Sequence, residues 1–197
     1  IKPMIQATLD ADWQKLLADG KTQYPVHAEM CSGMYEPALL EMLLSVCGGT
    51  RCLEIGMFTG TTAVTMALVP GVQKVVTLDI EPYLKEFNTP FWQKAGVADK
   101  IDCRIGDGLS TLKDLGEKGE KFDFVFIDAN KDGYVDYYNA LFSNNLLTEN
   151  ALIVADNTLY KAASFAPDSL VLTDPKVQGW AKDIHRFNQM VKDDERV

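Results

Sequence analysis

Hydrophobic positions change their spacing along the chain after residue 48. In the first 48 residues hydrophobic side chains recur every three or four positions, which is the spacing of an amphipathic helix. We expect two such helices, one over Ile5–Leu17 and one over Glu36–Val46. Their hydrophobic faces, which include Trp13 and Leu16, would pack either on the rest of the molecule or on a second subunit.

From residue 49 onward, short hydrophobic runs alternate with segments of helical spacing. The runs are typical of buried strands: Arg51–Ile55, Lys74–Leu78, Ile101–Ile105, Phe122–Ile127 and Ala151–Ala155. The segments between them are long enough for helices: Thr61–Val69, Tyr83–Ala95, Leu109–Leu115 and Tyr134–Phe142, and a last helix is expected over Val177–Lys192. This alternation predicts an α/β, doubly wound fold, in which helices cover both faces of a mainly parallel sheet.

Length and charge narrow the possible classes of protein. A chain of 197 residues suits a single domain, with residues 1–48 as N-terminal helices and residues 49–197 as the binding core. The formal charge of −9 disfavours nucleic acid and anionic membrane surfaces as partners, although it suits a cation or a positively charged cofactor. Four cysteines without a C-x-x-C pair favour the cytoplasm or another reducing compartment.

A glycine-containing loop follows the first predicted strand. Gly56 and Gly60 permit a tight turn and the close approach of a ligand to the backbone, and the next helix begins with free N–H groups. The chain has neither G-x-G-x-x-G nor G-K-[ST] here, so the dinucleotide fingerprint and the P-loop are not satisfied. The acidic Glu54 would repel a pyrophosphate and tolerate a sulfonium or ammonium group. The alternative is a glycine turn that serves packing alone.

Asp79, at the end of the second predicted strand, adds to this interpretation. A carboxylate at that position can accept hydrogen bonds from both hydroxyls of a ribose, as in other nucleoside-binding α/β folds. Together with the glycine loop it predicts a cofactor that contains adenosine. The alternative is a carboxylate that only caps a helix or faces water.

Polar residues also end the fourth and fifth predicted strands. Asp128 follows the fourth strand, and Asp156 and Asn157 follow the fifth. Adjacent parallel strands would bring these oxygen donors together, without histidine or cysteine, which suits Mg²⁺, Mn²⁺ or Ca²⁺ and not zinc. Lys131 would reach the same place. Strand-end aspartates often cap the next helix instead, but capping leaves the neighbouring Asn and Lys unexplained.

Four blocks in this order resemble a known family. They are Leu53–Gly60, Pro90–Val97, Ile127–Tyr134 and Asp156–Tyr160. The chain from Met30 to Val197 is similar to the cation-dependent O-methyltransferases that use S-adenosylmethionine, which include catechol and caffeoyl-coenzyme A O-methyltransferases.

The resemblance implies a role for each matching residue. It assigns S-adenosylmethionine binding to Met30, Ser32, Glu54, Gly56, Met57, Thr62, Asp79, Asp107, Gly108 and Asp128. It assigns a divalent cation, Mg²⁺ above all, to Asp128, Asp156 and Asn157, and it makes Lys131 and Asp128 the catalytic residues. The expected reaction is methyl transfer to one hydroxyl of a small vicinal aromatic diol, and the expected assembly is a homodimer.

The chain departs from the family pattern in three ways. Asn130 replaces a common acidic residue, and Tyr160 stands where Trp is frequent, so the preferred substrate stays open. The family continues into two more strands, so we expect a sheet that lacks its final strands. Tyr160, Phe165 and Trp180 would form a wall for a planar ring, with core packing as an equal alternative for Trp180.

Two other functions remain open at this point. One is an NAD-dependent oxidoreductase on a similar sheet, against which Glu54 and the missing third glycine argue. The other is a protein that binds S-adenosylmethionine without catalysis and works through partners.

Overall fold

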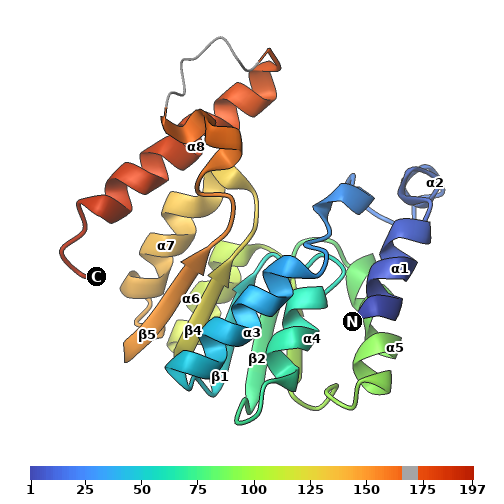
Figure 1. Cartoon of the computed structure of the whole chain (residues 1–197), viewed down its shortest axis with the longest axis horizontal. Coiled ribbons are helices and arrows are strands. Elements are labelled where there is room, and N and C mark those ends of the chain that lie inside the picture. Colours follow the sequence, from blue (N-terminus) through green and yellow to red (C-terminus); the bar gives the residue numbers. More distant parts are fainter. Residues whose placement is uncertain (166–172) are drawn as a thin grey trace.

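A five-stranded parallel sheet forms the centre of the computed structural model, which describes residues 1–165 and 173–197 (Figure 1). Its strands are β1 (Arg51–Ile55), β2 (Lys74–Asp79), β3 (Ile101–Ile105), β4 (Phe122–Ile127) and β5 (Leu147–Ala155). They lie in the order β3-β2-β1-β4-β5, and every neighbouring pair is parallel. The doubly wound fold is therefore confirmed, with β5 beginning four residues earlier than predicted.

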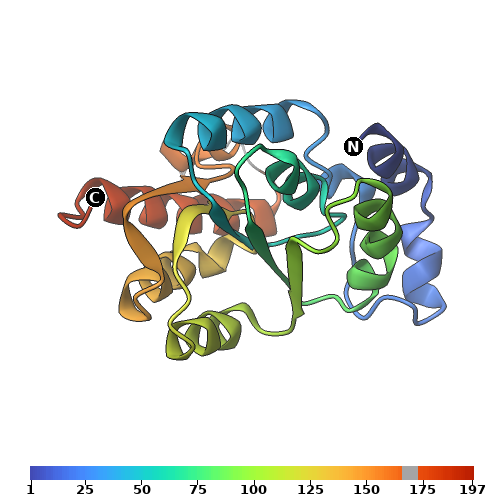
Figure 2. The same cartoon turned by 90° about the horizontal axis from the view of Figure 1, so that it is seen from below.

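Helices cover both faces of this sheet (Figure 2). They are α1 (Lys2–Asp10), α2 (Trp13–Ala18), α3 (Tyr35–Cys47), α4 (Thr61–Leu68), α5 (Tyr83–Lys94), α6 (Gly108–Glu117), α7 (Tyr134–Ser143) and α8 (Pro175–Lys192). One buried cluster joins the sheet to α3, α4 and α5, with Leu40 and Trp92 among its members. The other joins the opposite face to α6, α7 and α8, with Leu112 and Phe187 among its members. Burial on both faces explains why the strands are continuous hydrophobic runs.

The first predicted helix is broken into two. Ala11 is extended, and the carboxylate of Asp12 caps α2 by accepting a hydrogen bond from the Lys15 N–H at 3.0 Å. This break turns Trp13 into the core. The centroid of its ring lies 5.5 Å from that of the Phe58 ring and 5.4 Å from that of the Phe87 ring. The prediction of one continuous helix was wrong, because a capping aspartate in the middle of the pattern starts a new helix.

β5 lies at one edge of the sheet, and its side chains are at most half-buried. No further strand occurs in residues 156–165 or 173–197, as the expectation of a sheet without final strands requires. Within those parts of the chain that the structure describes, every helix is too short or too polar to span a bilayer.

The direction in which successive strands are added to the sheet reverses between β1 and β4. β2 and β3 extend the sheet on one side of β1, while β4 and β5 extend it on the other. In open α/β sheets, ligands bind outside the carboxyl ends of the strands at such a switch point. Gly56 follows β1 there with φ of +98°, and a Cβ at this position would overlap the carbonyl oxygen of Asp128, at the end of β4.

Replacing Gly56 should therefore lower the free energy of unfolding more than replacing a glycine that has a positive φ but open space around it. Gly71 is the matched control, because its φ is +93° and a Cβ added to it would have nothing within 4 Å. We expect Gly71→Ala to lower the free energy of unfolding by about 1 kcal/mol, and Gly56→Ala by at least about 3 kcal/mol. Urea denaturation of both variants measures the difference, and equal losses would show that the close approach is unimportant.

Candidate active site

Asp79 holds the glycine loop in place. Its Oδ2 accepts hydrogen bonds from the N–H groups of Met57 and Phe58, at 3.1 and 2.8 Å, and its Oδ1 accepts one from Glu81 at 2.9 Å. Burial raises the pKa of Asp79, although the three donors act in the opposite direction. A carboxylate accepts about four hydrogen bonds, so Oδ1 keeps capacity for a ribose hydroxyl. The structure thus gives Asp79 a structural role beside the predicted binding role.

Glu54 lies beneath the same loop and is fully buried. Its carboxylate accepts hydrogen bonds from the hydroxyl groups of Thr62, in α4, and Thr77, in β2. Burial raises the pKa of Glu54 to about 8, and the nearby charges of Asp128 and Asp79 act in the same direction. A positively charged group beside it would favour the ionised form.

The other residues predicted to bind the cofactor differ in how exposed they are and in which groups they present. The side chain of Met57 is in the core, 3% exposed, so only its backbone faces outward from the buried cluster. Asp107 caps α6 by accepting a hydrogen bond from the Ser110 N–H at 2.8 Å, and it is exposed. Gly108 begins α6, where a Cβ would lie 3.0 Å from the ring of Tyr137.

The segment before α3 runs close to the start of α4. The hydroxyl groups of Ser32 and Thr61 are 3.2 Å apart, and the Ser32 side chain acts to lower the pKa of Glu36. Met30 ends a short 3₁₀ helix (Ala28–Met30) and is half exposed. The structure therefore brings Ser32 to the start of α4 and leaves Met30 at the surface.

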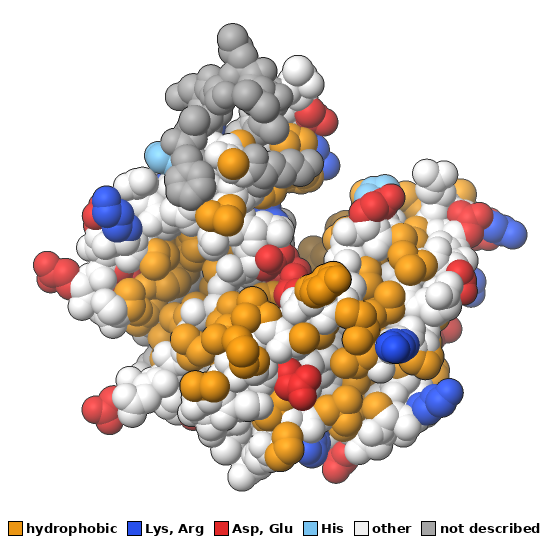
Figure 3. Space-filling model, in the orientation of Figure 1, with side chains coloured by type: hydrophobic (Ala, Val, Ile, Leu, Met, Phe, Trp, Pro, Cys, Tyr) orange, Lys and Arg blue, Asp and Glu red, His pale blue; other side chains and the backbone are white. Residues whose placement is uncertain are grey.

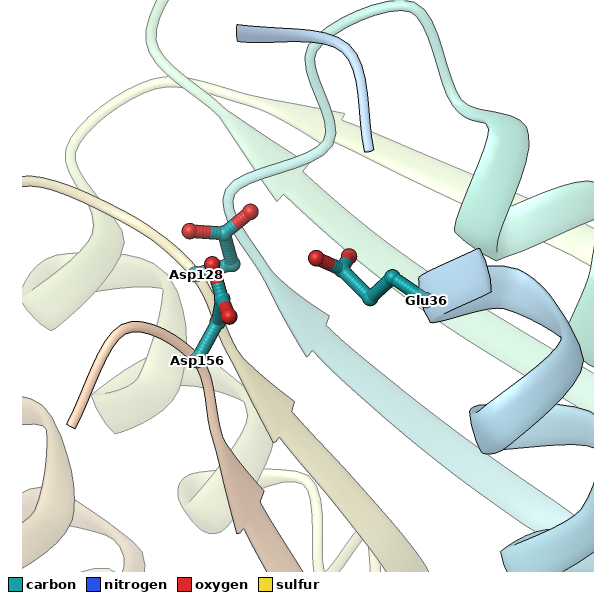
Figure 4. A group of neighbouring side chains, drawn as sticks. All are labelled: Glu36, Asp128 and Asp156. Atoms are coloured by element: carbon teal, nitrogen blue, oxygen red, sulfur yellow. The ribbon is translucent and has the colours of Figure 1, made fainter. Parts of the chain in front are cut away.

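Three carboxylates converge at the carboxyl edge of the sheet (Figure 4). Asp128 and Asp156 come from the ends of β4 and β5, as predicted, and Glu36 points toward them from the first turn of α3. One oxygen from each side chain lies within 4.8 Å of the others. Asn157 follows Asp156, is exposed and has φ of +56°. Sequence reasoning missed Glu36, because its position depends on how α3 packs on the sheet.

Lys131 supplies a positive charge to this group. Its Nζ lies 2.9 Å from Oδ1 of Asp128 and 2.7 Å from the hydroxyl of the buried Tyr134. Burial, followed by the charge of Asp128, raises the pKa of Asp156, and burial with the charges of both aspartates raises that of Glu36 to about 7. Oε1 of Glu36 is buried and has no hydrogen-bond partner among the described residues. The oxygen atoms of these three carboxylates fit a divalent cation such as Mg²⁺, and the ammonium group of Lys131 balances only part of their charge.

A segment that follows β5 is fastened to α8 beside the carboxylates. His185 contacts the carbonyl of Ser164 through Nδ1 at 2.6 Å, and the Asn188 amide donates to the carbonyl of Thr158 at 2.8 Å. Figure 3 shows a hollow between the region of α8 and the N-terminal region, with acidic side chains along it.

The structure shows the side-chain surroundings of two of the three residues in the predicted aromatic wall. Tyr160 packs against the second buried cluster and has φ of +36°. Trp180 is half-buried beneath the ammonium group of Lys176, which lies 4.7 Å from its ring centroid, and it belongs to neither buried cluster. The side chain of Phe165 lies outside the described residues.

Comparison with known proteins places the chain among O-methyltransferases. A family model described as O-methyltransferase matches residues 8–197. Caffeoyl-CoA O-methyltransferase 1 of Eucalyptus globulus is 40% identical over 141 residues, which cover 70% of this chain and 56% of that protein. Tricin synthase 1 of Oryza sativa subsp. japonica is 39% identical over 152 residues, which cover 74% of this chain and 60% of that protein. The chain thus spans little more than half of these relatives.

A solved structure agrees with these sequence matches. The SAH-bound methyltransferase PaMTH1 of Podospora anserina superimposes with a TM-score of 0.78 at 25% sequence identity, over 98% of this chain and 80% of that one. These comparisons support neither the NAD-dependent oxidoreductase nor the catalytically silent protein.

The buried carboxyl of Glu54 should make stability depend on pH in the ligand-free protein. Between its ordinary pKa of 4.5 and its folded value of about 8, the folded state keeps a proton that the unfolded state has lost. This group therefore destabilises the fold as pH rises from 5 to 8, by on the order of 2–4 kcal/mol.

Glu54→Gln removes that dependence, so its free energy of unfolding relative to the wild type should rise over the same range. Exposed Glu117→Gln is the control and should follow the wild type. Urea denaturation at pH 5, 6.5 and 8 gives the free energy of unfolding as a function of pH for the wild type and the two variants. If the Glu54→Gln curve runs parallel to the wild-type curve, the carboxyl does not titrate abnormally.

Proposed function

The chain belongs to the O-methyltransferase family, and on that premise we propose that it transfers a methyl group from S-adenosylmethionine to one hydroxyl of a vicinal aromatic diol. The proposal includes a divalent cation, Mg²⁺ first and Mn²⁺ or Ca²⁺ as alternatives. The observation that carries it is the position of Asp128 and Asp156 directly beside the glycine loop, where Gly56 touches the backbone of Asp128. The names of the two relatives favour an aromatic substrate.

The chain's own residues suit the cofactor. In this proposal Glu54, Gly56 and Thr62 receive its methionine end, and Met57 is a further member of the cofactor-binding set. Asp79 accepts from the ribose through the remaining capacity of Oδ1. The remaining members of the predicted set are Met30, Ser32, Asp107, Gly108 and Asp128.

Asp128, Asp156 and Asn157 would hold the cation. When both are bound, the cation lowers the pKa of a hydroxyl attached to it, and S-adenosylmethionine supplies the methyl group. Two neighbouring hydroxyls of a diol match such a site, because they can occupy two of its positions at once. Alignment of the reacting oxygen by the surrounding side chains can contribute on the order of 7 kcal/mol to lowering the barrier.

In this proposal Lys131 assists the loss of the proton from the reacting hydroxyl. Its Nζ is held from one side by Asp128 and from the other by Tyr134. As an ammonium group it stabilises the negative charge that departure of the proton leaves on oxygen, and only in its neutral form would it accept the proton itself. Tyr134 itself is anchored by an edge-to-face contact with Phe187 of α8, at 5.4 Å between ring centroids.

The proposal also includes a homodimer formed through residues 1–48. The outer face of α3 carries exposed hydrophobic residues at spacings of four, three and four: Tyr35, Leu39, Met42 and Val46. A stripe with that spacing is suited to packing against another helix. In Figure 3, hydrophobic side chains gather over this part of the surface.

Removal of the cation should abolish turnover. With caffeic acid and S-adenosylmethionine as substrates, we expect excess EDTA to lower the rate roughly 100-fold or more, and added Mg²⁺ to restore it. Asp128→Ala should lose activity to the same extent while it keeps most of its affinity for SAH, measured by calorimetry. Undiminished turnover in EDTA would refute the role of the cation.

Loss of the Lys131 amine should affect chemistry more than binding. We expect Lys131→Gln to lower kcat by about 100-fold or more, with little change in SAH affinity. Lys118→Gln is the control, because Lys118 pairs with Asp114 on the exposed face of α6. An unchanged kcat in Lys131→Gln would remove Lys131 from the mechanism.

A further inference from the structure

Glu36 faces the two aspartates from the opposite side of the site (Figure 4). Asp128 and Asp156 stand at the ends of two strands, whereas Glu36 belongs to the first turn of α3, in the N-terminal part of the chain. The three side chains place one oxygen each within 4.8 Å of one another. Two segments that are far apart in the sequence therefore present like charges to the same small volume.

A purely structural role does not account for this carboxylate. The ammonium group of Lys131 pairs with Asp128, and no ion pair to Glu36 occurs among the described residues. The favourable effect of an acidic residue in the first turn of a helix is worth only about 0.3–1 kcal/mol. Its buried oxygen Oε1 has no hydrogen-bond partner in the described part of the chain. The arrangement leaves an acceptor aimed at a place where negative charge already exceeds positive charge.

We propose that Glu36 is a third carboxylate of the cation site, so that the bound cation joins the start of α3 to the ends of β4 and β5. This inference rests on the proposed function, because it takes the cation at Asp128 and Asp156 as given. The donor set then contains three carboxylates, and a hard cation with oxygen ligands neutralises charge that Lys131 alone cannot balance.

The segment that carries Glu36 also links the proposed cation site to the glycine loop. Ser32 lies four residues before Glu36 in the same segment, and its hydroxyl lies 3.2 Å from that of Thr61, the first residue of α4 after the loop. A cation that fixes Glu36 therefore also fixes the segment beside the cofactor. Because coupling between two ligands is reciprocal, each should strengthen the binding of the other.

The test measures binding of Mn²⁺ by electron paramagnetic resonance in four proteins. Glu36→Gln keeps the shape of the side chain and removes its charge, and we expect it to weaken Mn²⁺ binding roughly 10- to 100-fold. Glu41→Gln, an exposed position on the same helix, removes the same charge outside the site and should bind Mn²⁺ like the wild type. Asp128→Ala should show the largest loss. In parallel, calorimetry compares SAH affinity with and without Mn²⁺, and the gain seen in the wild type should shrink in Glu36→Gln.

The outcomes separate this inference from the proposed function. If Glu36→Gln binds Mn²⁺ as tightly as the wild type while Asp128→Ala does not, Glu36 is no part of the cation site, although the site itself stands. If the wild type fails to bind Mn²⁺, both the inference and the proposed cation fall together. If Glu36→Gln and Glu41→Gln weaken binding equally, the effect is one of overall charge and the inference is wrong.

Discussion

Gly56 allows the end of β1 to pass directly against the backbone of Asp128 at the end of β4. Any side chain at this position would overlap the Asp128 carbonyl, and the positive φ favours glycine as well. The contact lies at the point where the chain reverses its winding, so it sets the distance between the loop after β1 and the side chains that follow β4. A cofactor on that loop and a cation held at Asp128 would consequently be neighbours.

Negative charge at this edge of the sheet is the second constraint. Glu54 is buried under the loop, and Asp128, Asp156 and Glu36 lie beside it, with Lys131 as the nearby positive group. Such charges repel one another and are costly to bury without compensation. The fold tolerates them because the raised pKa of Glu54, about 8, keeps that buried carboxyl protonated at neutral pH, and because the ammonium group of Lys131 pairs with Asp128. Positively charged ligands would complete the compensation, which is why the same residues that destabilise the site fit a sulfonium cofactor and a cation.

Much of this arrangement is predictable from the sequence, because the signals are local. Hydrophobic runs mark the buried strands, and residues at strand ends of a parallel sheet must meet at one edge, which places Asp79, Asp128 and Asp156. The break before Trp13 and the position of Glu36 are different. The first depends on a single capping aspartate within a helical pattern, and the second depends on the tertiary packing of α3. Met57 illustrates a further limit, since the pattern identifies the loop but not which of its side chains turns into the core.

The most direct measurement of the central claim is a crystal structure of the protein with SAH and Mn²⁺, with anomalous diffraction used to locate the manganese. The account predicts one anomalous peak enclosed by the carboxylates of Asp128 and Asp156, next to SAH seated on the Gly56 loop. A manganese peak elsewhere, or SAH bound away from that loop, would contradict it.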